Sequence, residues 1–351
     1  MVDRVITDAA TSIAAFIGHF DVASPRRVRS WSEFGNGVKG ARSTAVSPYL
    51  ADAMRGWFEN GGGPCWIAGA GEGGPLAGYE AALAALDVEV TIVVTPDLWE
   101  SQDDGAVIAK AVARHCVDAR NRMALLHTKK DAEPAKVPAL LGLDGEEAQF
   151  TTVYYPWLTV NDGNGGEKAV PPSGHVAGVW ARVDGERGVH KTPANTAVRG
   201  AAGLQHSLTD SEHGELNDAG VNALRVFPGQ GVLVWGARTL ASDTEWKYLS
   251  VRRLANYLYA SIVDGTSWAS FESNGDELQA AVRAQVATFL TAQWRRGALQ
   301  GARPAEAFFV ICDDSNNPSD SAGALSIDVG FAAVRPAEFV QLRITQVMAA
   351  E

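Results

Sequence analysis

The residues of this chain that could do chemistry are an aspartate, a histidine and a serine. Asp144, His175 and Ser267 follow one another along the sequence, and a glycine lies within two positions of each of them. A serine hydrolase needs these residue types, because a histidine must take the proton of the serine hydroxyl and a carboxylate must orient the histidine. The three positions therefore define a hydrolase hypothesis.

The runs around His175 and Ser267 resemble the histidine motif and the nucleophile motif of the subtilisin-like serine peptidases. In that family's H-G-T-H-V-A-G run the first histidine is the base, and an alignment on His175 places Pro172 at the base position. Proline cannot accept a proton, and the Leu-Asp-Gly context of Asp144 lacks the family's usual pattern. A subtilisin-like serine peptidase is thus the alternative function, and we expect Ser267 to lie in the turn after a helix.

The sequence signals for a dinucleotide-binding site and for a metal site are weaker than those for a hydrolase. The run from Gly35 to Gly40 fits the letters of a dinucleotide-binding fingerprint, but no buried strand precedes it, so a plain glycine loop is expected. Cys65, Cys116 and Cys312 are far apart in apolar runs and predict small buried side chains instead of a zinc or disulfide framework. The histidines are also scattered, so we expect no metal and no cofactor.

The elements that would position these residues alternate along the first part of the chain. Apolar runs at residues 12–18, 65–68, 90–95 and 123–127 predict buried strands, and residues 48–60, 76–86 and 106–119 predict helices between them. This alternation favours an α/β fold with a mostly parallel sheet covered by helices.

The alternation of strand and helix patterns becomes irregular between residues 129 and 188, where prolines and glycines predict a hinge region. Regular patterns resume with two predicted strands at residues 223–227 and 232–235. Two amphipathic helices follow, with apolar stripes over residues 246–262 and 278–290, and then a strand at residues 307–312.

The end of the chain contains one further strand pattern. Val340, Leu342 and Ile344 alternate with Gln341, Arg343 and a threonine, which is the period of a strand with one buried face. Such a strand is either an edge strand of its own sheet or an arm that completes the sheet of a neighbouring copy. The pattern alone leaves both readings open.

Length and charge limit the class of protein. A chain of 351 residues predicts two domains. The net charge of -11 disfavours binding to nucleic acid or to anionic lipid, so we expect neither a nucleic-acid partner nor membrane contact. The first ten residues lack the apolar core of a signal peptide, and we therefore expect synthesis in the cytoplasm.

Nine segments, in the same order, resemble the phage tail sheath family. They are residues 12–18, 53–68, 154–157, 170–178, 186–195, 216–231, 235–240, 251–254 and 335–346. Each match is weak, but the ordered set spans nearly the whole chain.

The resemblance implies a two-domain α/β protein. It implies an N-terminal strand or arm at residues 1–20 that packs with the C-terminal domain, and a subtilisin-like α/β outer domain at residues 21–190. It also implies an α+β C-terminal inner sheath domain at residues 191–335 and a terminal strand arm at residues 336–351.

The resemblance also implies a mechanical function. Sheath subunits of this family form a homo-oligomer, a helical stack of hexameric rings around an inner tube protein, and contract to drive the tube through a target envelope; baseplate and cap proteins are further partners. The expected particle is a phage tail or phage tail-like particle made in a bacterial cytoplasm.

The residues expected to contact neighbours fall into three groups. The inter-subunit arm comprises Phe339, Val340, Gln341, Leu342, Arg343 and Ile344, the N-terminal arm comprises Val2, Arg4, Val5 and Ile6, and Lys247, Arg252 and Arg253 are expected to face the tube.

Overall fold

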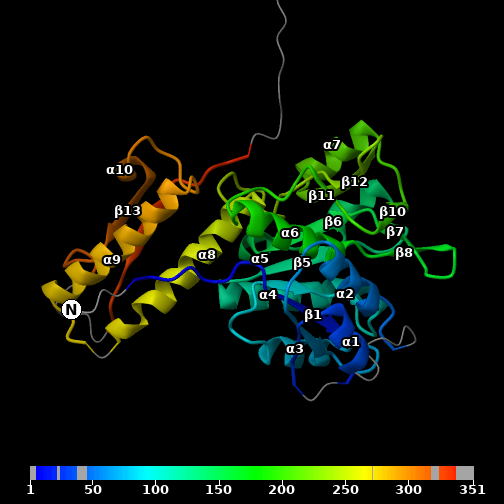
Figure 1. The fold of residues 1–351 in the computed structure, drawn as a ribbon, viewed down its shortest axis with the longest axis horizontal. Helices are drawn as coiled ribbons and strands as arrows, with labels where there is room; N and C mark the ends of the chain where they lie inside the picture. The colour runs from blue at the N-terminus through cyan, green and yellow to red at the C-terminus, as the bar shows by residue number, and fades with distance from the viewer. Residues whose placement is uncertain (1–4, 22–23, 38–45, 271, 318–323, 337–351) are drawn as a thin grey trace, which may run out of the picture.

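The computed structural model describes residues 5–21, 24–37, 46–270, 272–317 and 324–336. These residues form two lobes, a larger α/β lobe and a smaller C-terminal lobe, which Figure 1 shows side by side, with the long helix α8 on the side of the smaller lobe that faces the larger one. Each lobe has its own hydrophobic cluster: one includes residues from Ala14 to Leu249, and the other combines Ile6 and Val189 with residues from Leu254 to Cys312.

A nine-stranded sheet forms the centre of the α/β lobe, in the order β2-β3-β1-β4-β5-β6-β11-β12-β9. The six strands from β3 to β11 in that order are parallel, and β2, β12 and β9 add to the edges in antiparallel pairing. The strands are β1 (Ala14–Gly18), β2 (Arg26–Val28), β3 (Cys65–Gly69), β4 (Ile92–Val94), β5 (Met123–His127), β6 (Thr151–Tyr155), β9 (Thr196–Ala197), β11 (Val221–Phe227) and β12 (Gly231–Val234).

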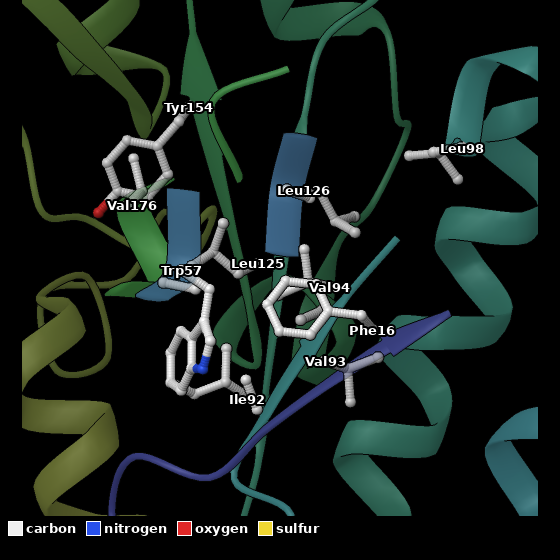
Figure 2. Packing of buried hydrophobic residues seen from close by; sticks show 14 of the residues in the cluster. Phe16, Trp57, Ile92, Val93, Val94, Leu98, Leu125, Leu126, Tyr154 and Val176 are labelled. Atoms are coloured by element: carbon white, nitrogen blue, oxygen red, sulfur yellow. The ribbon is translucent and has the colours of Figure 1, made fainter. Parts of the chain in front are cut away.

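Helices in two groups cover this sheet: α2 packs on α6, and α3 and α5 pack on α4. Figure 2 shows the core that results, in which Phe16 from β1 meets the indole of Trp57 from α2 edge to face at 5.9 Å between ring centroids. The helices of this lobe are α1 (Trp31–Gly37), α2 (Leu50–Glu59), α3 (Leu76–Ala84), α4 (Gly105–Ala119), α5 (Gly145–Gln149), α6 (Ser173–Arg187) and α7 (Asp210–Asp218), with short 3-10 turns η1 (Leu98–Glu100) and η2 (Pro134–Ala139). The predicted parallel α/β architecture is confirmed.

The predicted hinge at residues 129–188 is wrong. This segment contains β6, the antiparallel pair β7 (Leu158–Asn161) and β8 (Glu167–Val170), and α6, whose residues are mostly buried. β10 (Ala201–Leu204) pairs with β7 to complete a small second sheet. Pro156 lies directly after β6 and Pro172 directly before α6, so these two prolines end and begin structure without loosening it.

The strand pairing also departs from the domain limits expected at residues 20 and 190. β1 pairs with β3 and β4 in the middle of the large sheet, although the whole of residues 1–20 was expected to pack with the C-terminal domain. β11 pairs with β6, so residues up to 234 belong to the same sheet as β1. The lobes instead meet where the chain enters α8.

The C-terminal lobe is a pair of long helices with a two-stranded sheet. It comprises α8 (Leu249–Thr266), the turn η3 (Ser267–Ala269), α9 (Asp276–Arg295), α10 (Pro304–Ala307), β13 (Phe308–Ile311) and β14 (Asp328–Phe331). β13 contacts α9 and pairs with β14 in antiparallel register. Ser267 lies in the turn after α8, as predicted. Trp246 precedes that helix and lies in a turn, next to the isolated bridge between Arg238 and Tyr248.

Glycines allow α2 and α6 to approach closely. A Cβ added at Gly174 in α6 would lie 2.4 Å from the Cα and 2.4 Å from the carbonyl oxygen of Ala53 in α2. No real Cβ contact is that short, and backbone atoms cannot rotate away, so any side chain at residue 174 must push the helices apart.

We therefore predict that Gly174→Ala lowers the free energy of unfolding by about 1 to 3 kcal/mol, the usual cost of overpacking. Gly185→Ala in the same helix is the matched control, because no atom lies within 4 Å of its added Cβ and alanine is the better helix former. Urea unfolding measures both variants. Equal stability of the two variants would contradict the close packing of α2 on α6.

Candidate assembly surface

The chain begins along the C-terminal lobe before it enters the sheet. Figure 1 shows this N-terminal segment passing along α8 toward β1. Ile6 is 6% exposed and belongs to the C-terminal cluster, where Gly265 of α8 makes room for it: a Cβ at residue 265 would lie 2.6 Å from the Ile6 side chain. The backbone N–H of Ala9 donates to the hydroxyl of Ser261, also in α8, at 3.0 Å.

Asp8 joins the same segment to both long helices. Its carboxylate accepts hydrogen bonds from the Tyr257 hydroxyl at 2.6 Å and from the Arg296 guanidinium at 2.7 Å. Partial burial would raise the pKa of Asp8, but the hydrogen bonds from Tyr257 and Arg296 outweigh it and lower that pKa below its ordinary value. Asp8 therefore stays ionised at neutral pH and fixes the segment in its own chain.

The contacts of Ile6 and Asp8 with their own chain limit which residues of the expected N-terminal arm could contact a neighbour. Ile6 is held by its own chain, so in this conformation it is not free to contact a neighbour, whereas Val5 is 76% exposed. Val2 and Arg4 lie outside the described residues.

Arg253 of α8 is not a surface residue, and its expected tube-facing position is wrong for this conformation. Its side chain is 3% exposed, and its two terminal nitrogens donate to the two carboxylate oxygens of Asp184 at 2.9 and 2.6 Å. It also donates to the carbonyl oxygen of Thr11 at 3.0 Å and lies over the ring of Trp180 at 4.6 Å. One guanidinium thus joins α8, α6 and the chain entering β1.

The two other expected tube contacts also have partners within the chain. Arg252 lies over the rings of Trp246 and Phe150, at 4.0 and 4.5 Å, and burial lowers its pKa to about 10. Lys247 is partly exposed and lies 5.7 Å from the ring of Tyr248. A tube-facing role for these two residues stays a prediction.

A groove of about 810 Å³ opens in the C-terminal lobe. One wall is α8, with Ala255, Tyr259 and Val263 at successive helical turns, and the opposite wall is the chain leading into β14, with Leu325, Val329 and Phe331. Tyr259 and Val263 remain 46% and 52% exposed, which is unusual for apolar side chains at adjacent turns of one helix. An apolar groove of this kind is typical of an interaction site.

An unpaired strand edge lies at the rim of this groove. Among the residues that the structure describes, β13 is the only strand paired with β14, so one edge of β14 has no strand beside it. Free N–H and C=O groups on that edge are a template for another strand. β13 lies on α9 while β14 faces the groove, so an added strand would cover Tyr259 and Val263 of α8.

The predicted terminal strand, which would pair with this edge of β14, lies outside the described residues. Phe339, Val340, Gln341, Leu342, Arg343 and Ile344 all fall within residues 337–351, which the structure does not describe. Their assignment as an inter-subunit arm therefore stays a prediction.

The hydrolase residues are not brought together. His175 lies at the start of α6, 3% exposed, with its ring against Gly56 of α2, and burial lowers its pKa to about 4. Ser267 follows α8 in the other lobe, and Asp144 precedes α5. The first part of the glycine run, Gly35 to Gly37, ends α1 instead of following a strand, and its remainder lies outside the described residues.

Within the described ranges, no three histidine, cysteine or carboxylate side chains are grouped so that they could hold a metal ion. No helix in these ranges combines the length and apolarity that a membrane span requires. Cys65, Cys116 and Cys312 are buried free thiols, as predicted.

Comparisons with known families match both lobes. A family model described as the phage tail sheath protein central domain matches residues 76–240, and one described as the phage tail sheath C-terminal domain matches residues 241–346. The limit between the two models falls between β12 and α8, close to where the lobes meet.

Solved sheath structures match nearly the whole chain. The sheath of an extracellular contractile injection system, the PVC sheath complex in its contracted state, is 30% identical, with a TM-score of 0.83 over 98% of this chain and 94% of that one. The helical sheath of the anti-feeding prophage in its contracted state is 29% identical, with a TM-score of 0.81 over 97% of this chain and 95% of that one.

A curated relative is longer than the region it shares with this chain. The tail sheath protein of Vibrio phage KVP40 is 27% identical over 168 residues, which are 47% of this chain and 24% of that protein. The chain thus matches about a quarter of the length of this phage protein.

Proposed function

Because this chain belongs to the phage tail sheath family, we propose that it is a self-assembling sheath subunit whose copies stack in hexameric rings around an inner tube. The proposed action is contraction of the stack, which drives the tube through a target envelope. The observation that carries this proposal is the apolar groove beside the unpaired edge of β14, since a subunit with such an edge can be extended by another chain.

The fit between the groove and the terminal strand supports the proposal. Leu342 and Ile344 alternate with polar residues and would face the groove, while backbone hydrogen bonds would satisfy the edge of β14. Donation of a strand from one copy to the next is a head-to-tail contact, which propagates into rings or helices and does not close at a dimer. The stack would then be linked through its inner, C-terminal lobes.

The similarity to two sheaths in the contracted state supports a contractile cycle. Contraction requires two packings of the same subunits, which differ by rigid-body movement about the connecting segments. No nucleotide is required if the energy is stored in the extended lattice at assembly. The inner tube, baseplate and cap proteins are the proposed partners, and a subtilisin-like topology of the α/β lobe belongs to the same proposal.

Deletion of residues 339–351 tests the function. We expect the purified full-length chain to form helical tubes visible by electron microscopy, and the shortened chain to remain a folded monomer, because the groove of each copy would lack its strand. Circular dichroism of the shortened chain controls for folding. Tubes formed by the shortened chain would refute the role of the terminal strand.

A further inference from the structure

We propose that Arg252, at the start of α8, is a contact residue between copies, and that its two terminal nitrogens bind a carboxylate of a neighbouring copy. This inference rests on the proposed function, because it concerns a second contact within the same assembly. It assigns Arg252 a partner other than the inner tube, which is the partner expected from the sequence.

The guanidinium of Arg252 is held in one position by its own chain. Its central carbon lies 4.0 Å from the ring centre of Trp246, before α8, and 4.5 Å from that of Phe150, after α5. The Nε–H donates to Oδ1 of Asn256 at 3.0 Å, and the Asn256 amide is itself oriented, because its nitrogen donates to the Arg122 carbonyl at 3.3 Å. The guanidinium is therefore pre-organised, so little side-chain entropy is lost when it binds a further group.

The two terminal nitrogens of Arg252 have no acceptor in their own chain. Among the residues that the structure describes, no oxygen accepts a hydrogen bond from them, and Arg252 forms no ion pair. The next residue is different, because Arg253 donates both of its terminal nitrogens to Asp184. Arg252 is only partly buried, so its unused edge reaches the surface. A planar pair of N–H donors of this kind matches the two oxygens of a carboxylate.

The charge of Arg252 is only partly compensated within the chain. Burial and the charge of Arg120, at the end of α4, lower the pKa of Arg252, and Glu146 and Glu245 offset this only in part. The pKa of about 10 still leaves the guanidinium charged at neutral pH. Buried cationic side chains are usually paired with a carboxylate. A carboxylate from outside the chain would supply the missing partner.

A second copy of this chain is the partner that the composition favours. The chain contains 41 aspartates and glutamates against 30 lysines and arginines, so every copy offers carboxylates in excess. The proposed stack places copies side by side, within reach of one another. An arginine beside a partly exposed tryptophan, as Arg252 is beside Trp246, is also typical of the residues that dominate the binding energy of an interface.

Carbodiimide cross-linking tests the contact directly. Arg252→Lys replaces the guanidinium by an amine, which forms an amide with a carboxylate that the reagent has activated. This variant is isotope-labelled and assembled with an excess of the unlabelled, unchanged chain. We expect mass spectrometry to find peptides that join residue 252 of a labelled copy to an aspartate or glutamate of an unlabelled copy. They should be at least about 10-fold more abundant than those from the matched control Arg295→Lys, an exposed arginine at the end of α9.

The concentration dependence of assembly gives a second readout. Arg252→Gln removes both the charge and the paired donors. We therefore expect the critical concentration for assembly to rise at least about 10-fold, whereas Arg295→Gln should change it by less than about 2-fold. Urea unfolding gives the fraction of folded subunit for both variants, so a loss of stability is not mistaken for a loss of assembly.

Two results would overturn this contact. One is a mixed tube in which residue 252 cross-links only within its own copy, or not at all, and the other is an equal critical concentration for the two glutamine variants. The purified chain is assembled without tube protein, so a cross-link between differently labelled copies reports a contact between copies. If the unchanged chain forms tubes, these results leave the proposed function standing; if it forms none, the proposed function fails and this contact fails with it.

Discussion

We expect Val263→Arg to abolish tube formation at the concentrations where the unchanged chain is expected to assemble. The side chain lies on the α8 wall of the groove and is 52% exposed, so arginine at this position is solvated in the monomer. In the assembled state the same guanidinium would be covered by the apolar side of a neighbour's strand without a partner charge, and burial of an unpaired charge is costly. We expect the critical concentration for assembly to rise by at least about 100-fold, equivalent to about 2.7 kcal/mol.

Val107→Arg is the matched control for this variant. Val107 is a valine of similar exposure, 50%, on α4 of the other lobe, and it does not line the groove. Both substitutions should leave the free energy of unfolding within about 0.5 kcal/mol of the unchanged chain. Pelleting assays over a concentration series measure assembly. If Val263→Arg and Val107→Arg assembled alike, the groove would not be the contact between copies.

The second large effect is on stability, at the junction of the two lobes. Arg253→Met removes the partner of Asp184, whose side chain is 2% exposed, and leaves that carboxylate buried without its counter-charge. Breaking a buried ion pair in this way costs about 3 to 5 kcal/mol. Loss of the hydrogen bond to the Thr11 carbonyl and of the contact with Trp180 adds to the destabilisation.

The double variant Asp184→Leu with Arg253→Met separates the charge effect from packing. Replacement of both partners removes the unpaired carboxylate, so we expect the double variant to be more stable than Arg253→Met alone. Guanidinium unfolding measures all three chains. A cost below about 1 kcal/mol for Arg253→Met would show that this ion pair does not hold the lobes together.

The elements of the sheet were predictable from the sequence because their signals are local. β5 at residues 123–127 and α4 at residues 105–119 follow the predicted ranges closely, since an apolar run or a helical stripe is visible within one segment. The predicted hinge is wrong for a local reason as well: the prolines beside β6 and α6 predict loose structure from the sequence, although they lie at element ends.

The functional surface was much less predictable, because it depends on contacts between distant segments. Arg253 looks like an exposed basic residue in its helix, and its partner Asp184 lies in another element. The groove requires α8 to face residues 324–331, so neither wall reveals it alone. Exposed Tyr259 and Val263 were a possible signal, since they form a second apolar stripe on α8 beside the core stripe. The alternation of apolar and polar residues at 339–346 predicts a terminal strand, but these residues lie outside the part of the chain that the structure describes.

The most direct test of the account joins two different chains. One chain carries only Val263→Cys and the other only Leu342→Cys, and the two are mixed before assembly, so a disulfide between residues 263 and 342 can form only between copies. We predict this cross-link in assembled tubes under mild oxidation, and much less of it when Arg343→Cys replaces Leu342→Cys. Tubes in which neither mixture forms a cross-link, or in which both form it equally, would contradict strand donation between subunits.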